Sequence, residues 1–380
     1  MGALIAALPT GAQDGVWIRQ QAALATLARR AAARLARRVG LDASRVGEIE
    51  LAVTEVAVNL DKHAVDGALL LRLVEIDGCA AVELLAIDQG PGMADVAHAR
   101  RDGVSSAGTL GIGLGVVERM ADAFDVHSLP GRGTVLVARF RERPERSGRA
   151  AVACPEPTAA GLTRPLSGES LCGDAWTARS VPADPAEQDP KQDAVKQDSV
   201  KQDAAKQDTA MVVVLCDGLG HGPLAALASE QAVAAFHGTA SADPKELLGV
   251  LHRALAGTRG GAAAVAMIDP CERRVSYCGV GNISGFVVAD GRRNTLLSAP
   301  GIVGHHLPRL RVFDAALPEG ASLVLHSDGL TERWDVNALP GLFRRSSTVI
   351  AAHLLREAGV RRDDASVVVV KGVGPAGDPS

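Results

Sequence analysis

Residues 86–93, AIDQGPGM, decide the fold of the first part of the chain. An apolar run that predicts a strand over residues 80–87 ends here, and Asp88 follows it directly. Gly90 and Gly92 come next, and at a glycine the backbone can approach a ligand because no Cβ stands in the way. The stretch therefore predicts a ligand-binding loop at the end of a strand.

The segment upstream predicts a helix over residues 42–63, whose last turns carry the polar stretch TEVAVNLDKHA (54–64). Glu55 and Asn59 are four residues apart, so they share one helical face, which Lys62 and His63 continue. A carboxylate, an amide and a cation therefore point the same way.

The segment downstream is rich in glycine and reads GTLGIGLGVVERM (108–120). It predicts a loop that feeds a helix, whose free backbone N–H groups can hold phosphates. After this helix we expect one further strand. No Walker-type GxxxxGK[ST] motif occurs in the sequence.

In this order, residues 14–140 resemble the GHKL ATP-binding fold, and within it the anti-sigma-factor and stressosome switch kinases of the RsbT type. The resemblance implies a Bergerat α/β sandwich that binds ATP and Mg²⁺. Asn59 would hold Mg²⁺, and Asp88 would accept a hydrogen bond from the adenine amino group. Glu55 would be the catalytic base that takes the proton from a protein Ser or Thr hydroxyl. The remaining ATP-binding positions implied are Gly90, Gly92, Gly111, Gly113, Gly115 and Thr134.

Two breaks in composition divide the chain. Residues 146–163 predict a linker between a first domain at 1–145 and a second at 164–374. Within the second, 182–210 is a low-complexity insertion with the units KQDAV, KQDSV, KQDAA and KQDTA. Such a segment buries too little apolar surface to offset its ordering entropy, so it predicts a solvated loop.

In the second domain, aspartates next to glycine follow apolar runs. They are Asp174 in LCGDAW, Asp217 in LCDGLGHG and Asp328 in LHSDGLTE, with the pair Asp363 and Asp364 in RRDDASVVVV. A single aspartate next to a glycine usually marks a turn. Four acidic positions that converge at sheet edges would supply the oxygen ligands that hard divalent ions need.

This order resembles the PPM-type metal-dependent Ser/Thr phosphatases of the SpoIIE branch over residues 165–372, with the RsbX type a near likeness. It implies a β-sandwich flanked by helices, and therefore an α+β protein of two domains. Asp217 and the Gly218 carbonyl would bridge two Mn²⁺ or Mg²⁺ ions, and Asp174, Asp328 and Asp363 would complete the set. Asp363 is preferred over Asp364 by aligning DDAS with the closing motif of the family. The ions would activate a water for in-line attack on phosphoserine or phosphothreonine.

Composition excludes other classes. The 380 residues carry 40 Lys and Arg against 44 Asp and Glu, a net charge of −4, so a mainly electrostatic nucleic-acid binder is disfavoured. No run of about 18 apolar residues predicts a membrane span. The six cysteines form no CxxC pair, and we expect reduced thiols and a cytoplasmic protein.

Three hypotheses follow. The first is a bifunctional regulator that phosphorylates and dephosphorylates Ser or Thr on a STAS-type partner, with a downstream switch protein as a further partner. The second is a phosphatase gated by a non-catalytic, ATP-sensing and partner-binding domain. The third is a non-catalytic scaffold, against which four convergent carboxylates argue because they would repel one another without metal.

Overall fold

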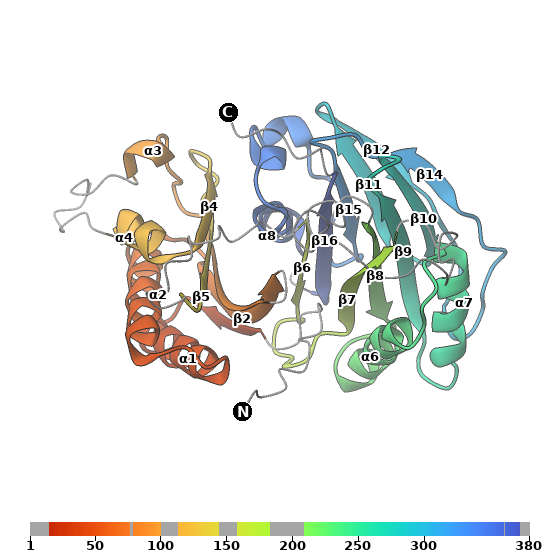
Figure 1. Cartoon of the computed structure of the whole chain (residues 1–380), viewed down its shortest axis with the longest axis horizontal. Coiled ribbons are helices and arrows are strands. Elements are labelled where there is room, and N and C mark those ends of the chain that lie inside the picture. Colours follow the sequence, from red (N-terminus) through yellow and green to blue (C-terminus); the bar gives the residue numbers. More distant parts are fainter. Residues whose placement is uncertain are drawn as a thin grey trace, which may run out of the picture. The chain divides into compact units, whose positions relative to one another are not determined.

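The computed structural model describes residues 15–76, 79–99, 113–143, 158–182, 209–360 and 362–372 (Figure 1). They fall into two compact units, and residues 339–357 belong to the first unit together with residues up to 157. The second unit comprises residues 158–338 and the chain from 358 onward. Gly111 and the repeats at 183–208 lie outside the described residues.

The first unit is built on a five-stranded antiparallel sheet in the order β1-β2-β3-β5-β4. The strands are β1 (Val16–Arg19), β2 (Ala68–Ile76), β3 (Cys79–Ile87), β4 (Ala123–Ser128) and β5 (Thr134–Arg141). The expectation of a single strand after the glycine-rich helix was wrong, because both β4 and β5 follow it. β4 is an edge strand that includes Asp125 and His127, so it lacks the apolar run that marks an inner strand.

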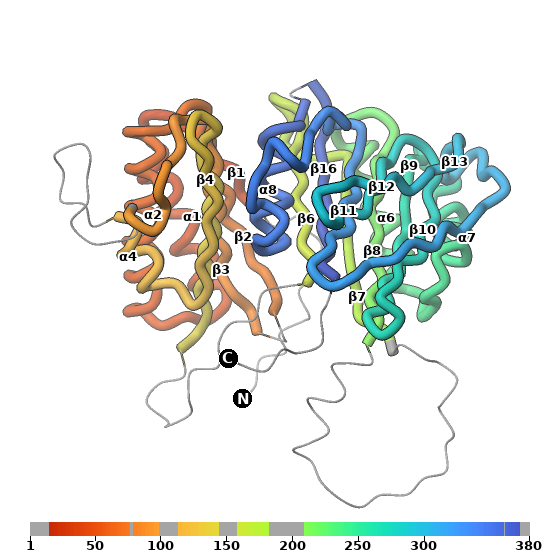
Figure 2. Tube along the Cα trace, turned by 90° about the horizontal axis from the view of Figure 1, so that it is seen from above, coloured from red at the N-terminus to blue at the C-terminus, as the bar shows by residue number. Residues whose placement is uncertain are grey.

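Helices cover one face of this sheet (Figures 1 and 2). α1 (Leu24–Arg38) and α2 (Ala43–His63) pack on each other and on the apolar face of the strands, where Leu71, Leu84 and Phe140 are fully buried. α3 (Val96–Ala99) is short, and α4 (Gly113–Met120) packs against α2. The helix expected over residues 42–63 and the strand expected over residues 80–87 are confirmed to within one residue.

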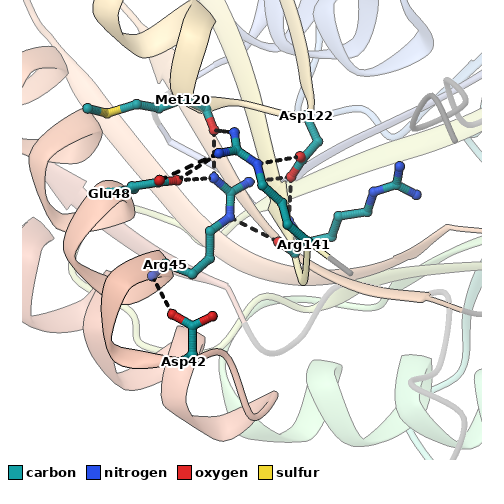
Figure 3. Close-up of polar contacts among 7 residues, drawn as sticks. Asp42, Arg45, Glu48, Met120, Asp122 and Arg141 are labelled. Carbon is teal, nitrogen blue, oxygen red and sulfur yellow. Dashed lines mark hydrogen bonds and ion pairs between the residues drawn. The ribbon is translucent and has the colours of Figure 1, made fainter. Parts of the chain in front are cut away.

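A buried arginine fixes α2 against the end of α4 (Figure 3). The Arg45 guanidinium donates to the Met120 carbonyl at 2.8 Å and to the Arg141 carbonyl at 3.0 Å. It also forms ion pairs with Glu48 and Asp122. Because every guanidinium nitrogen has an acceptor, burial of this charge is compensated, and the helix that carries the candidate catalytic residues is held in place.

The opposite face of the sheet carries buried charged side chains. Glu83 lies between two arginines, with Arg72 Nε at 2.7 Å and Arg139 Nε at 2.8 Å from its carboxylate oxygens. Arg139 also donates to the Thr348 hydroxyl at 2.9 Å. Thr348 lies on α8 (Ser347–Ala358), so this helix from the later part of the chain belongs to the first unit through residue 357.

The second unit is a β-sandwich. One sheet has the order β13-β10-β9-β8-β7 with β14 also paired to β10, and the other has the order β12-β11-β15-β16-β6. The strands are β6 (Ala159–Arg164), β7 (Asp174–Pro182), β8 (Thr209–Gly218), β9 (Gly261–Asp269), β10 (Arg274–Val280), β11 (Ser284–Ala289), β12 (Arg292–Leu296), β13 (Ser298–Ala299), β14 (Phe313–Ala316), β15 (Ser322–His326) and β16 (Ala365–Lys371).

Two apolar cores stabilise this unit. One lies between the sheets and includes Tyr277, Leu323 and Leu325, while the other lies between the first sheet and the helices α6 (Pro223–His237) and α7 (Pro244–Ala254). The expected α+β class, with a helix-flanked β-sandwich after an α/β layer, is confirmed. Within the described ranges, no helix combines the length and apolar character needed to cross a membrane.

The ends of two expected segments differ from the structure. Residues 159–163, expected in the linker, form most of β6, because this small apolar run pairs with β16. Residues 209–210, expected in the insertion, begin β8. Since Pro182 and Thr209 are register partners, the insertion connects two adjacent antiparallel strands.

Candidate functional site

The first candidate site begins at the N-terminus of α4. Glu55 and Asn59 project from α2 toward Gly113, the first residue of α4. A Cβ at Gly113 would lie 3.1 Å from Asn59 Nδ2 and 3.6 Å from Glu55 Oε2, so a larger residue would crowd both groups. Gly115 is buried two residues further along α4. The structure therefore brings a carboxylate and an amide to a helix N-terminus, where backbone N–H groups favour anions.

The second element of this site is the loop after β3. The half-buried Asp88 receives the Gly90 N–H on its own Oδ1 at 2.7 Å, and its backbone N–H donates to the Thr134 carbonyl at 3.0 Å. Burial raises the pKa of Asp88, while the Gly90 hydrogen bond and the nearby Arg356 charge oppose the rise. The carboxylate is thus held in a fixed direction, as recognition of a donor group on a ligand requires.

Two glycines allow the close approach around Asp88. Gly133 has φ +70° and Gly92 has φ +67°, a backbone region that favours glycine. A Cβ at Gly133 would lie 2.0 Å from the Asp88 carbonyl oxygen, and one at Gly92 would lie 2.1 Å from the Leu129 carbonyl oxygen. The loop after β3 and the loop between β4 and β5 therefore contact each other directly.

Ser128 joins these loops, and it was not among the site residues predicted from the sequence. Its hydroxyl donates to the Gly133 carbonyl at 3.1 Å, accepts the Met93 N–H at 2.8 Å, and lies 2.9 Å from the Thr134 hydroxyl. The only available signal was its place at the end of β4, a strand that was not predicted.

The end of α2 connects the two elements of the site. The position that a Gly90 Cβ would occupy is 2.6 Å from the His63 carbonyl oxygen, so the Asp88 loop packs on the last turn of α2. The Lys62 and His63 side chains are exposed. Of the expected ATP-binding positions, only Gly111 lies outside the described residues.

A second candidate site lies in the β-sandwich, where Asp174 and Asp217 are register partners on β7 and β8. Asp174 is 2% exposed, and its Oδ2 accepts a hydrogen bond from the Ser327 hydroxyl at 2.7 Å. Ser327 directly follows β15 in the other sheet. The two sheets are therefore joined at the carboxylates.

The carboxylates of this cluster act on one another electrostatically. Burial raises the pKa of Asp174 and of Asp217, and the negative charges of Asp174, Asp328 and Asp363 raise that of Asp217 further. The structure gives none of these four aspartates an ion pair with any Lys, Arg or His that it describes. Their negative charge is thus left for another cation to compensate.

Asp328 is oriented by a residue that the sequence did not identify. Asn282 Nδ2 donates to Asp328 Oδ2 at 2.6 Å, and Asn282 follows the end of β10. Burial and the Asp363 charge raise the pKa of Asp328. The signal was an amide in the turn that ends VSYCGVGN, the stretch that stands where the phosphatase family shows an AGH-like turn.

The adjacent aspartates 363 and 364 have different surroundings. The buried Asp364 accepts the Leu166 N–H at 2.7 Å and the Gly173 N–H at 2.8 Å, so its two oxygens tie loops together. The half-buried Asp363 acts electrostatically on Asp217 and Asp328, and the charge of Asp364 raises the pKa of Asp174. Both oxygens of Asp364, however, are already engaged by backbone N–H groups. These surroundings favour Asp363 as the member of the pair that faces the cluster.

The donor chemistry of the cluster fits a hard divalent cation. All side-chain donors in the cluster are carboxylate oxygens, which such ions prefer. Gly218 packs closely on α6, because a Cβ there would lie 2.3 Å from the Ala225 carbonyl oxygen. Across the part of the chain that the structure describes, no three His, Cys, Asp or Glu side chains form a finished ion cage.

Comparison with known proteins identifies a family for each of the two domains. Residues 18–140 match the family model of the histidine kinase-like ATPase domain, and residues 207–372 match that of stage II sporulation protein E (SpoIIE). The serine/threonine-protein kinase RsbT of Bacillus subtilis (strain 168) is 33% identical over 111 residues, which cover 29% of this chain and 84% of RsbT.

Two further matches are a curated phosphatase and a solved structure. The phosphoserine phosphatase RsbX of Bacillus subtilis (strain 168) is 26% identical over 122 residues, which cover 32% of this chain and 61% of RsbX. A solved structure described as "The bacterial stressosome: a modular system that has been adapted to control secondary messenger signaling" is 28% identical to this chain. The match covers 56% of this chain and 98% of the solved chain. Its TM-score is 0.45, so this likeness carries no argument by itself.

The two domain types stand in one chain, a kinase-like ATPase domain before a PPM-type serine phosphatase domain of the partner-switch class. Through its N-terminal part the chain belongs to the RsbT family of histidine kinase-like ATPases, joined to a SpoIIE-type phosphatase domain.

Proposed function

We propose that the chain is a bifunctional regulator that adds phosphate to Ser or Thr of a partner protein and removes it again. The observation that carries the proposal is that both sites retain their reactive groups. Glu55 stands beside Asn59 at the start of α4, and four carboxylates in the sandwich act on one another with no ion pair to a cationic side chain among the described residues.

In the kinase half, ATP is the substrate and Mg²⁺ the companion ion. Asp88 accepts a hydrogen bond from the adenine amino group, and the N–H groups at the start of α4 hold phosphate oxygens. Asn59 supplies an amide oxygen for Mg²⁺. Glu55 takes the proton of the attacking hydroxyl as the γ-phosphoryl group leaves ADP.

In the phosphatase half, Asp174, Asp217, Asp328 and Asp363, with the Gly218 carbonyl, hold two Mn²⁺ or Mg²⁺ ions. When bound, such ions make a water nucleophilic near neutral pH and orient it for in-line attack. Ser327 and Asn282 orient Asp174 and Asp328, so these carboxylates keep the same direction when the substrate enters.

The partner in this proposal is a STAS-type protein, and a downstream switch protein is a further partner. Similarity to RsbT and RsbX supports Ser or Thr of that partner as the residue acted on, because the two relatives are named as a serine/threonine-protein kinase and a phosphoserine phosphatase. We place the reaction in the cytoplasm because ATP is the phosphate donor.

The test uses labelled ATP and purified STAS-domain proteins with the full chain, with and without Mn²⁺. We expect the label on the partner, and its release when Mn²⁺ is added. Glu55→Gln should stop transfer while ATP still binds, whereas Glu50→Gln on the same helix is the matched control. If neither the unchanged protein nor Glu55→Gln transfers phosphate while both bind ATP, the first domain is an ATP sensor that gates the phosphatase. If Glu55→Gln transfers as well as the unchanged protein, Glu55 is not the catalytic base.

A further inference from the structure

Helix α8 is seated on the sheet of the first unit by polar contacts near its N-terminal end. The Asp125 carboxylate accepts the Ser346 N–H at 2.8 Å, and the Thr348 hydroxyl accepts an Arg139 N–H at 2.9 Å. His127 Nε2 lies 3.1 Å from the Pro340 carbonyl oxygen. These contacts fix α8 to β4 and β5.

The other end of α8 reaches the candidate nucleotide site. Arg356 is buried, and its Nη1 donates to the Asp88 carbonyl oxygen at 2.8 Å. Its Nη2 lies 2.8 Å from His353 Nδ1, and the His353 ring packs at 4.9 Å from the ring of His127. The guanidinium is therefore held from both sides and cannot follow a moving loop.

We propose that Arg356 is a positioning residue of the nucleotide site, through which the docking of α8 and the binding of ATP are linked. This rests on the proposed role of Asp88 in adenine recognition. The Asp88 backbone is held at its N–H by the Thr134 carbonyl, while Arg356 is the side chain that holds its carbonyl. A hydrogen bond from a charged donor is stronger than one between neutral groups, so its loss releases the loop.

The surroundings of the Asp88 carbonyl oxygen make the position of its loop depend on the contact with Arg356. The same oxygen lies 2.0 Å from the position of a Cβ at Gly133, so it is enclosed by backbone on one side and by Arg356 on the other. Without the guanidinium, the peptide after Asp88 can rotate. The Asp88 carboxylate, which is fixed by the Gly90 N–H in the same loop, would turn with it.

Linkage makes the effect reciprocal. If docking of α8 improves ATP binding, bound ATP stabilises docked α8 by the same free energy. Arg356 precedes Asp363 by only seven residues, and its segment belongs to the part of the chain that matches the SpoIIE model. Nucleotide occupancy thereby acts on the chain that leads directly into the acidic cluster.

The test measures the dissociation constants of ATP and GTP for the full chain by calorimetry. Asp88 accepts from the adenine amino group, and guanine carries a carbonyl at that ring position, so the ratio of the two constants reports on Asp88. We expect Arg356→Gln to weaken ATP binding about tenfold and to reduce the preference for ATP over GTP by a similar factor, the loss expected for one charge-assisted hydrogen bond. Arg356→Lys should recover part of the preference.

Thr348→Val is the matched control, because it removes a contact that seats the same helix without touching Asp88. It should leave the ATP preference unchanged even if it lowers the melting temperature. An unchanged preference in Arg356→Gln, or in Arg356→Lys should the first variant not fold, would overturn the inference. If the unchanged protein binds neither nucleotide, the proposed kinase function falls first and the inference with it.

Discussion

Asp174 and Asp217 face each other as register partners across β7 and β8, and burial raises the pKa of both. Two buried carboxylates side by side favour the protonated form, since both charges cannot be accommodated without a cation. This relationship makes the second unit sensitive to pH and to divalent ions.

The first prediction concerns stability against pH. The folded-state pKa values of Asp174 and Asp217 lie above the unfolded value of about 4, so the two groups contribute stability that is fully present below that pH. It is lost as pH rises through the folded values. We expect this contribution to lower the melting temperature of the metal-free protein from pH 5 to pH 9, in addition to the effects of other titrating groups.

Mn²⁺ or Mg²⁺ should reverse this trend, because a bound cation favours the charged carboxylates. Thermal unfolding in EDTA and in excess Mn²⁺ across this pH range measures the effect. The variant Asp217→Asn should flatten the metal-free dependence. Equal melting curves with and without the ion at pH 8 would contradict an ion site here.

Asn282 should support metal binding through Asp328. Removing a group that orients a ligand commonly costs about 10-fold to 100-fold in metal affinity or activity. We therefore expect Asn282→Ala to raise the Mn²⁺ concentration for half-maximal phosphatase activity at least about tenfold. Asn294→Ala, at an exposed position of β12, is the control that should leave the Mn²⁺ requirement as it is.

Gly133 and Gly131 form a matched pair in the loop before β5. Both have positive φ, +70° and +73°, so alanine strains the backbone at either position by about 1–2 kcal/mol. Only at Gly133 would the new Cβ meet the Asp88 carbonyl, whereas nothing lies within 4 Å of a Cβ at Gly131.

We expect Gly133→Ala to abolish measurable ATP binding and Gly131→Ala to retain it, as measured by calorimetry. The melting temperature of each variant separates general strain from the local clash. Retained ATP binding in Gly133→Ala would show that the Asp88 loop does not form the adenine site.

Glu83 is the acceptor for two arginines in the sheet. Desolvation alone would raise its pKa, but the charges of Arg72 and Arg139 outweigh it and keep the pKa below the ordinary value. Glu83→Gln leaves two buried cations without their anion, and we expect a loss of about 3–5 kcal/mol in the free energy of unfolding. Urea denaturation measures this loss. Glu142→Gln, at an exposed carboxylate, should change stability by less than about 0.5 kcal/mol.

The sequence predicted the strand over residues 80–87 because it is an apolar run. It predicted one strand where β4 and β5 both lie, since the polar residues Asp125 and His127 of β4 are matched by contacts with Ser346 and Pro340. It could not show that Arg72, Glu83 and Arg139 are buried. Charged residues usually lie at the surface, and only the pairing of β2, β3 and β5 brings these three together.

The sequence predicted those site residues that stand in local motifs. Aspartates at strand ends could be identified from DG and DD pairs, whereas Ser327 and Asn282 needed the register between strands to be recognised. The helical pattern of STVIAAHLLREA does not encode the surface that α8 covers. Its place on the first sheet follows from long-range contacts, such as that between Thr348 and Arg139. The assigned roles of the site residues stay predictions until they are measured.

The most direct test of the central claim follows labelled phosphate on a STAS-domain partner with three forms of the full chain, in ATP, Mg²⁺ and Mn²⁺. The unchanged protein should release phosphate with little labelled partner, because transfer and removal balance. Asp217→Asn should accumulate labelled partner, and Glu55→Gln should make none yet still strip a partner labelled beforehand. If Asp217→Asn accumulates no labelled partner while ATP binds, the chain does not carry both opposing activities.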